Sequence, residues 1–521
     1  MKSRTRMWID VMCLCTALAM PVGMAAQDGP SQDHKPKHQK YKLVDIGTFG
    51  GPASYINNGF SLGAPNQING RGTTVGAAAT SIPSPGNSNT SICEGLDGAV
   101  PFVFHAFKWQ DSAVTDLGTL PGPDNCSVAT SINEDGEIAG YGENGVTDPL
   151  IGIREVRAVV WKNGEIRDLG TFGGNQSILG NINNRGQVAG SATNAIPDPF
   201  SLYYQLGGFS SGTQTRAFLW QNGQKQDLGT LGGPDAVGFF VNERGQVVGA
   251  SYTNSIPNPT TGLPTLDPYL WEKGAMIDLG TLGGTNGSAF LLNNRGDVIG
   301  TSNLAGDQTS HPFLWHDGKL IDLFTSTIGG SPITANQLNE NGEFVGGATF
   351  PNRPFDAYLW RNGVATDLGA LNGDCFSEAV ALNSAGQVVG YSVACDFSSQ
   401  RSFLWENGSM VDLNALIPPN SGLQLVETIA INDRGEIGGD GDPAGCGGDA
   451  ACGHAYILIP DGDCDSDCEG RIASSQNSAV PAQNAATMKQ SSESPISPVE
   501  RSRSQMRQRY HLPGQPPAPR D

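Results

Sequence analysis

The fold of this chain is decided by a stretch that reads Asp278-Leu279-Gly280-Thr281-Leu282-Gly283-Gly284, then Asn293-Asn294-Arg295-Gly296, then Phe313-Leu314-Trp315. These three phrases recur along the chain. The Asp that opens the first phrase stands at Asp45, Asp116, Asp168, Asp227, Asp278, Asp322, Asp367 and Asp412. The Asn that opens the second stands at Asn69, Asn133, Asn183, Asn242, Asn293, Asn339, Asn383 and Asn432. The Trp that ends the third stands at Trp109, Trp161, Trp220, Trp271, Trp315, Trp360 and Trp405, and an eighth copy at 454–458 lacks it. A repeat of this length determines the architecture before any single residue is considered.

Each copy contains four short strand signals. In the fifth copy they lie at 288–293, 297–302, 312–315 and 319–323, and tight turns separate the first from the second and the third from the fourth. The Asp-Gly pair at 317–318 is of the kind that adopts positive φ in a hairpin turn. Two hairpins in tandem predict one blade of a β-propeller, and the lack of helical periodicity excludes a helical solenoid.

The register of the copies predicts how the ring closes. The chain enters at 41–45 with an outermost strand that has no blade of its own, and the last copy has no outermost strand. We therefore expect an all-β fold, a single eight-bladed β-propeller closed by an N-terminal outer strand that completes the last blade. A propeller of seven blades, with one copy outside the ring, is the alternative.

Residues outside the repeats predict export. Lys2, Arg4 and Arg6 precede an apolar run from about residue 11 to residue 26, so we expect a signal peptide over 1–26. We expect a linker over 27–40, the propeller over 41–460, an acidic turn over 461–470 and a disordered tail over 471–521. No stretch after residue 26 is apolar for long enough to span a bilayer.

Eight cysteines follow the predicted signal peptide, and an even number in an exported chain predicts disulfides. Their positions in the connections between strands favour the pairs Cys93–Cys126, Cys375–Cys395, Cys446–Cys452 and Cys464–Cys468. The sequence leaves other pairings open.

The net charge of −20 is unevenly distributed. Residues 41–470 carry 45 of the 51 acidic residues but 18 of the 31 Lys and Arg residues. An acidic body repels the nucleic-acid backbone, so we expect no nucleic-acid partner. We also expect a monomer.

The connections between strands predict two different faces. The turns from first to second strand and from third to fourth are tight, whereas the loops from second to third strand are long in the first four copies, as at 191–215 and 251–268. Three of these loops share a phrase, at 81–85, 195–199 and 255–259. Long loops on a rigid scaffold usually carry binding, so we expect the ligand there; covering the neighbouring blades is the alternative.

The recurring polar and aromatic residues have structural interpretations. The repeated Asp ends an outermost strand, where capping of the following loop is expected, and the repeated Trp should pack between blades. Three of the histidines, His105, His311 and His454, occupy one slot in separate copies and cannot converge on one metal ion. We find no catalytic motif and expect no organic cofactor.

One acidic stretch resembles the start of a calcium loop. Asp461, Asp463, Asp465 and Asp467 alternate with other residues, as oxygen ligands of Ca²⁺ often do. The glycine at the sixth position and the distal glutamate of a complete loop are missing. A solvated acidic turn is the alternative.

The motif His105-Ala106-Phe107 and its equivalents resemble the HAF repeat of bacterial extracellular proteins. The glycine pairs and the Trp of the outer strands are also similar to those of kelch-type blades. The resemblance covers nearly all of residues 41–460. It implies a propeller that is secreted, periplasmic or at the surface of a bacterium, and it implies no biochemical activity.

These observations predict a non-catalytic exported propeller that binds a protein or a glycan through the face that bears the long loops and the cysteines. A polysaccharide hydrolase or lyase that uses loop acids such as Asp198 or Asp235 is the first alternative. A structural surface protein without a specific ligand is the second.

Overall fold

A computed structural model describes residues 38–56, 66–84, 101–122, 124–202, 211–351, 353–446 and 452–461. The chain divides into two units, 1–37 and 38–521, and the described residues belong to the second. Apart from the short helix α2 (Leu323–Ser326) and a single 3-10 turn, η2 (Leu413–Ala415), the regular structure of these residues is β-strand.

The strands form antiparallel groups, most of them four-stranded, which makes the fold an all-β propeller. In the order of hydrogen-bonded neighbours the groups are β2 (Gly50–Tyr55), β3 (Thr74–Pro83), β4 (Phe102–Gln110) and β5 (Ala113–Asp116); β6 (Ser127–Ile132), β7 (Ile138–Thr147), β8 (Arg154–Lys162) and β9 (Glu165–Asp168); β10 (Gly173–Ile182), β11 (Val188–Pro197), β12 (Thr213–Gln221) and β13 (Gln224–Asp227); β14 (Ala236–Val241), β15 (Val247–Tyr252), β16 (Leu266–Glu272) and β17 (Ala275–Asp278); β18 (Gly283–Leu292), β19 (Val298–Leu304), β20 (Ser310–His316) and β21 (Lys319–Asp322); β22 (Ser331–Pro332) with β23 (Gln337–Leu338), β24 (Phe344–Phe350), β25 (Arg353–Arg361) and β26 (Val364–Gly369); β27 (Asp374–Leu382), β28 (Val388–Ala394), β29 (Gln400–Glu406) and β30 (Ser409–Asp412); β31 (Leu423–Ile431), β32 (Ile437–Pro443), β33 (His454–Pro460) and β1 (Tyr41–Asp45).

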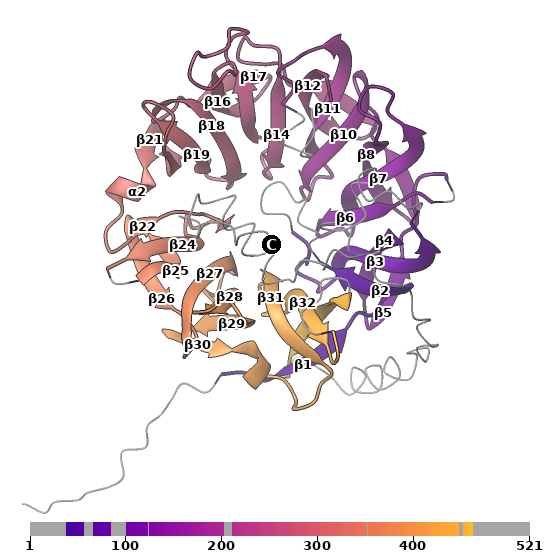
Figure 1. Cartoon of the computed structure of the whole chain (residues 1–521), viewed down its shortest axis with the longest axis vertical. Coiled ribbons are helices and arrows are strands. Elements are labelled where there is room, and N and C mark those ends of the chain that lie inside the picture. Colours follow the sequence, from indigo (N-terminus) through magenta and orange to yellow (C-terminus); the bar gives the residue numbers. More distant parts are fainter. Residues whose placement is uncertain are drawn as a thin grey trace, which may run out of the picture. The chain divides into compact units, whose positions relative to one another are not determined.

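The groups follow one another around a common centre (Figure 1). β16 and β18, from neighbouring groups, also share one parallel pair, Leu266 with Asn286. At the other end of the order, β1 lies antiparallel to β33, with Tyr41 opposite Pro460 and Asp45 opposite Tyr456. The first and last strands are therefore neighbours in one sheet.

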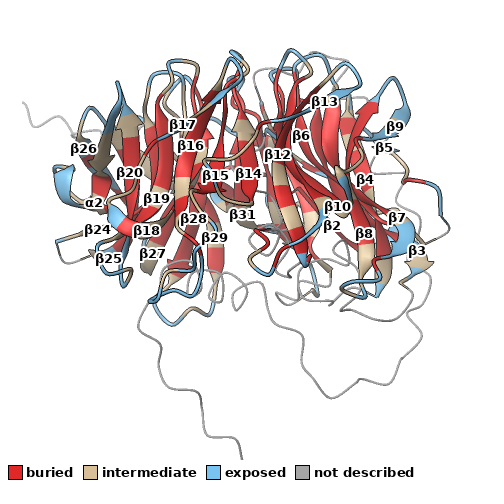
Figure 2. Cartoon of the chain, turned by 90° about the horizontal axis from the view of Figure 1, so that it is seen from above, coloured by how far each residue is buried: buried red, intermediate tan, exposed pale blue. Residues whose placement is uncertain are grey.

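Antiparallel order places the connections at two ends of each sheet. The loop from the second to the third strand begins at the end of the sheet where the first strand starts. It therefore lies on the same face as the connection that enters the sheet from the preceding one, and we call this face the loop face. The turns from third to fourth strand lie at the other end, and Asn163 and Gly164 show their geometry, with φ of 55° and 80°. Exposed residues gather in these connections, whereas the strands between them are mostly buried (Figure 2).

Glycine on the second strand makes room for an aromatic side chain on the third. A Cβ added to Gly249 would lie 1.9 Å from the backbone oxygen of Val237 and 2.9 Å from the hydroxyl of Tyr269. The Tyr269 hydroxyl itself donates to that same oxygen at 3.0 Å. This packing lets a large aromatic residue reach full burial inside a sheet, as Tyr269 does.

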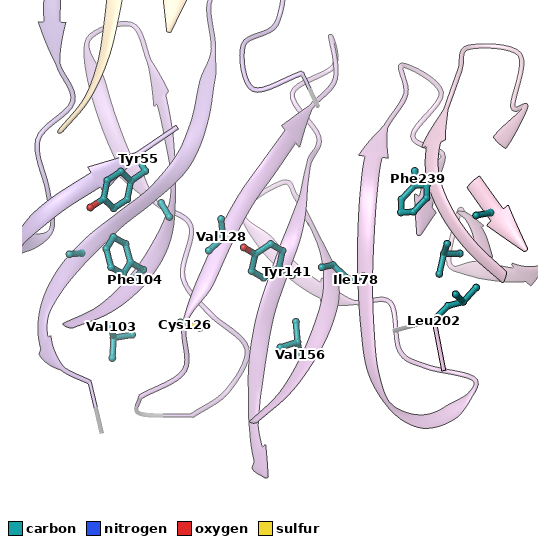
Figure 3. Close-up of a cluster of buried hydrophobic side chains, with 14 of the residues drawn as sticks. Tyr55, Val103, Phe104, Cys126, Val128, Tyr141, Val156, Ile178, Leu202 and Phe239 are labelled. Atoms are coloured by element: carbon teal, nitrogen blue, oxygen red, sulfur yellow. The ribbon is translucent and has the colours of Figure 1, made fainter. Parts of the chain in front are cut away.

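Several sheets contribute to each apolar cluster. One cluster combines Tyr55, Phe104, Tyr141, Ile178 and Phe239, which come from successive sheets (Figure 3). The repeated tryptophans serve the same purpose: all seven lie in or against such clusters, and Trp161 packs with Val75 and Ala106 of the preceding sheet. The expectation that Trp packs between sheets is confirmed.

The turn asparagines link neighbouring sheets near their first strands. Each side-chain oxygen accepts backbone N–H groups of its own turn, as Asn183 does from Arg185 and Gln187 at 3.0 and 2.9 Å. Within the described residues, seven of the eight side chains also donate to the backbone oxygen of the next turn asparagine, at 2.8–3.2 Å. The donor–acceptor steps are Asn69 to Asn133, Asn133 to Asn183, Asn183 to Asn242, Asn242 to Asn293, Asn293 to Asn339, Asn383 to Asn432 and Asn432 to Asn69.

Candidate functional site

A cavity of about 750 Å³ opens on the loop face between the last two sheets of the chain. Three connections line it: the β28–β29 loop, the segment from η2 to β31, and the end of β32 with the loop that follows. The lining residues are Ser398, Ser399, Gln400, Asn414, Ile417, Pro418, Pro419, Asn420, Ser421, Gly422, Leu423, Gln424, Val426, Glu427, Asp442, Pro443, Ala444 and Gly445.

The lining is rich in amides and hydroxyls, and none of its residues is Lys, Arg, His or aromatic. Asn414 is held in place, because its side-chain oxygen accepts from Leu425 N at 2.8 Å and its amide donates to Leu425 O at 3.0 Å. It therefore shapes the wall of the cavity and keeps little hydrogen-bonding capacity for a ligand. The two acids of the lining, Glu427 and Asp442, favour neutral or cationic groups over anions.

Gln400 is the residue of the lining whose chemistry points to a ligand. Its side chain is 5% exposed, and its amide oxygen has no hydrogen-bond partner among the described residues. Leaving such a group unsatisfied in a protein interior costs about 1–3 kcal/mol. The oxygen is enclosed in this structure, so a ligand that supplies a donor would recover that cost once the Gln400 side chain turns toward the cavity.

Disulfides stabilise the loops around the cavity. Cys375–Cys395 joins β27 to the loop that precedes Ser398, and Cys446–Cys452 closes the loop directly after Gly445. Cys126 is also disulfide-bonded, whereas Cys93, Cys464 and Cys468 lie outside the described residues. The two bonds fall on the loop face, where the sequence placed the cysteines.

The loops of earlier sheets share a local geometry that the sequence revealed only in part. Asn194 accepts a hydrogen bond from Ile196 N, and Asn254 accepts one from Ile256 N, each at 2.8 Å. Asn144 does the same for Val146 at 2.9 Å, although that loop has Thr147 where the others have proline. The turn leaves these three aliphatic side chains 51–75% exposed.

Asp198 and Asp235 do not lie at an open rim, which corrects the expectation that they could act as loop acids. They are 5% and 0% exposed, and their carboxyl groups lie close enough to interact. Burial, together with the neighbouring Asp198, raises the pKa of Asp235 to about 8. Neither residue lines the cavity described above.

The repeated Asp caps the loop that follows it, as expected. Asp168 Oδ1 accepts from Gly170 N at 2.6 Å, and the same bond forms at Asp45, Asp116, Asp227, Asp278 and Asp367, with variants at Asp322 and Asp412.

On the third strand, the residue two positions before the Phe or Tyr faces this Asp. His105, His311 and His454 each bond to their Asp at 2.9–3.0 Å through Nδ1, and Arg216 does so through its guanidinium. Asp267 departs from the pattern, because it sets a carboxyl group against Asp278. Burial and that neighbour raise the pKa of Asp267 to about 6. His105, His311 and His454 therefore have a structural role within their own sheets.

The predicted calcium stretch falls at the edge of the described residues. Asp461 is exposed, and its backbone N–H donates to Lys40 O at 3.0 Å. Asp463, Asp465 and Asp467 lie outside the described residues. Within the described ranges, no group of three or more His, Cys, Asp or Glu side chains is placed to hold a metal ion. No helix among them is long and apolar enough to cross a membrane.

No protein-family profile matches the chain, and no curated protein matches it in sequence. Among solved structures, it is similar to Porphyromonas gingivalis dipeptidyl peptidase 4, at 10% identity over 65% of this chain and 54% of that chain, with a TM-score of 0.38. It is also similar to a Trypanosoma rangeli sialidase, at 8% identity over 83% and 61%, with a TM-score of 0.29. A third likeness is to an ulvan lyase, at 10% identity over 82% and 84%, with a TM-score of 0.25.

The chain thus spans about half the length of the dipeptidyl peptidase that it matches. At identities of 8–10% and TM-scores below 0.4, these likenesses assign no role to any residue of this chain.

Proposed function

We propose that this protein is an exported, non-catalytic β-propeller that binds a neutral glycan in the loop-face cavity between its last two sheets. The observation that carries the proposal is the unsatisfied amide oxygen of Gln400 in the wall of that cavity. Sugar hydroxyls donate and accept hydrogen bonds, and they suit a lining of amides, hydroxyls and carboxylates. Ile417, Pro418 and Pro419 supply apolar surface for the faces of a sugar ring.

We propose that the scaffold has eight blades and that β1 closes it by completing the blade of β31, β32 and β33. The antiparallel register of β1 with β33 supports closure. The bond from Asn432 to Asn69 supports it independently, because it continues the series of turn contacts from the last repeat to the first. A closed ring would hold the walls of the cavity at a fixed separation.

Export is proposed from the signal-peptide pattern over 1–26 and is supported by the disulfides of the loop face. The resemblance to the HAF repeat is consistent with a bacterial secreted, periplasmic or cell-surface protein.

Calorimetric titration with defined neutral oligosaccharides (β-glucan, xylan, mannan and chitin oligomers) tests the proposal. We expect at least one class to bind, and Gln400→Leu to weaken its binding roughly tenfold or more, because a buried hydrogen bond is lost. Gln308→Ala is the matched control, since Gln308 is exposed in the corresponding β19–β20 loop. The absence of binding by any class, or equal binding by Gln400→Leu, would overturn the proposal.

The same oligosaccharides separate binding from catalysis. Glu427 and Asp442 line the cavity together, so a hydrolase or lyase would depend on them. Release of reducing ends or of unsaturated products that is lost in Glu427→Gln or Asp442→Asn would replace the binding proposal with an enzyme. We expect no product from the wild-type protein.

A further inference from the structure

A buried pair of carboxyl groups ties one loop of the loop face to the strand of the next sheet. Asp198 lies in the loop after β11, and Asp235 lies directly before β14. Asp198 Oδ1 accepts from Phe200 N at 3.0 Å, and Asp235 Oδ2 accepts from Leu202 N at 2.6 Å. The remaining oxygens, Asp198 Oδ2 and Asp235 Oδ1, have no donor among the described residues.

No cationic side chain of the described residues neutralises the pair. Arg216 on β12 comes near, since it donates to Pro234 O, but its guanidinium pairs with Asp227 at 3.0 Å. From β15, Tyr252 faces the pair with an uncharged hydroxyl that donates to Phe200 O at 3.0 Å. The segment 203–210 contains no Lys, Arg or His in its sequence.

The corresponding carboxyl groups of the neighbouring sheets have partners other than the pair. In the preceding repeat, Asp148 is satisfied by Asn175 and Gln176 at 2.9 and 3.0 Å. In the following sheet, Asp267 interacts with Asp278. Two ionised carboxylates without a counter-charge would repel each other in a buried site. One shared proton gives each unpartnered oxygen a partner at once.

The preceding repeat contains the same junction with an amide in place of one carboxyl group. Gln176 and Asp235 both stand seven residues before their turn asparagines, Asn183 and Asn242. Gln176 donates to Asp148 through Nε2 and accepts from Val156 N through Oε1 at 2.9 Å. Asp235 likewise interacts with the loop carboxylate, and its Oδ2 accepts a backbone N–H, that of Leu202, at 2.6 Å. The Asp148–Gln176 junction therefore provides an internal control for the Asp198–Asp235 pair.

The junction also holds apolar residues in place. Leu202 is 1% exposed and belongs to the cluster that contains Val237 and Phe239 (Figure 3). Its N–H is the group that Asp235 binds. Separation of the two carboxyl groups would break this anchor and draw Leu202 out of the cluster.

We propose that the Asp198–Asp235 pair is a proton-operated latch that holds residues 198–202 on the next sheet and releases them when the shared proton is lost. The latch is closed at neutral and acidic pH. It opens under alkaline conditions, because the second carboxylate then becomes charged beside the first. It controls the exposure of Phe200 and Leu202 on the loop face, at a place independent of the proposed glycan cavity.

Pulsed hydrogen exchange of the full chain, with pulses scaled to the intrinsic exchange rate at each pH, tests the latch. We expect protection of the Leu202 amide to fall at least tenfold between pH 7 and pH 9. Asp235→Gln copies the arrangement of Gln176, so its protection should not change with pH. The reciprocal Gln176→Glu should give the 148–153 loop the pH dependence that it lacks in the wild type.

Three results would overturn the latch. One is protection of Leu202 that is constant from pH 7 to pH 9 in the wild type. Another is an equal fall in Asp235→Gln, which would place the titrating group elsewhere. The third is recovery of protection at pH 9 on addition of millimolar CaCl₂, which would assign a cation to the pair in place of a proton. Melting curves of both variants establish that they are folded before exchange is measured.

Discussion

The side-chain amide of Asn432 donates a 2.9 Å hydrogen bond to the backbone oxygen of Asn69, across a sequence separation of 363 residues. The same side chain donates to Glu436, and its oxygen accepts from the N–H groups of Arg434 and Glu436. One buried asparagine thus orders its own turn and joins the last repeat to the first.

Replacing this asparagine should destabilise the whole protein. Asn432→Ala leaves buried N–H groups and the Asn69 carbonyl without partners, and each such loss costs about 1–3 kcal/mol. We expect a lower midpoint in urea denaturation. Asn341→Ala is the control, because Asn341 is an exposed residue in an equivalent turn. Equal midpoints for the two variants would show that the turn contacts contribute little.

Asp267 should make the protein less stable as the pH rises. Its pKa in the folded state is about 6, above the value of about 4 in an unfolded chain, so the folded state holds the extra proton between these values. Stability should therefore fall as the pH rises from about 4 to 6 and stay lower above that range. Asp267→Asn should flatten this part of the pH profile and raise stability at pH 7 by about 1–3 kcal/mol.

Melting temperatures of the wild type and Asp267→Asn between pH 4 and pH 8 measure the effect. Asp267→Arg supplies the residue that other sheets have in this slot, as at Arg157 and Arg216, and should stabilise the protein at pH 7 as well. The idea fails if both variants melt below the wild type at pH 7.

Gly249→Ala should be strongly destabilising. The added methyl group would meet the Val237 carbonyl and the Tyr269 hydroxyl, and neither can move without breaking the β14–β15 pairing or the tyrosine's hydrogen bond. Overpacking of this kind typically costs about 1–3 kcal/mol or more. Gly453→Ala is the control, because its nearest neighbour would be 3.5 Å away. Soluble expression and thermal melting of the two variants compare them, and similar melting temperatures would contradict the packing argument.

Loss of the two described disulfides should have unequal effects. Chain-entropy arguments give about 3 kcal/mol for a loop of the size closed by Cys375–Cys395, which are 20 residues apart, and about 2 kcal/mol for Cys446–Cys452, which are 6 apart. The paired serine variants, compared by urea denaturation, measure the difference. A larger loss for the shorter loop would show that local packing outweighs chain entropy.

The sequence was sufficient for the strand order and for the roles of the recurring residues. The capping by Asp168 and the burial of Trp161 follow from their positions at strand ends, because the periodic pattern fixes which strand each occupies. The pairing of β1 with β33 followed from register, since the first copy has a strand too many and the last copy one too few.

Contacts between repeats could not be read in the same way. The Asp198–Asp235 pair joins a loop to the next sheet, and nothing in either local sequence shows that the two carboxyl groups meet. The loop that exposes Val146 was missed because Thr147 replaces the proline of the shared phrase. The cavity was not expected beside Gln400, because the loops there are short and the longer ones lie in earlier repeats.

The pairing of β1 with β33 has a consequence for how the protein folds during and after synthesis. The strand that is synthesised first cannot find its neighbour until the last repeat has been made, so the final step of folding brings together segments about 410 residues apart. If the chain is exported as it is made, its opening strand would wait in an unpaired state outside the membrane. During that interval the β31–β33 sheet has a bare edge that another chain's β1 could fill, which makes exchange of this strand between molecules the characteristic hazard of its assembly.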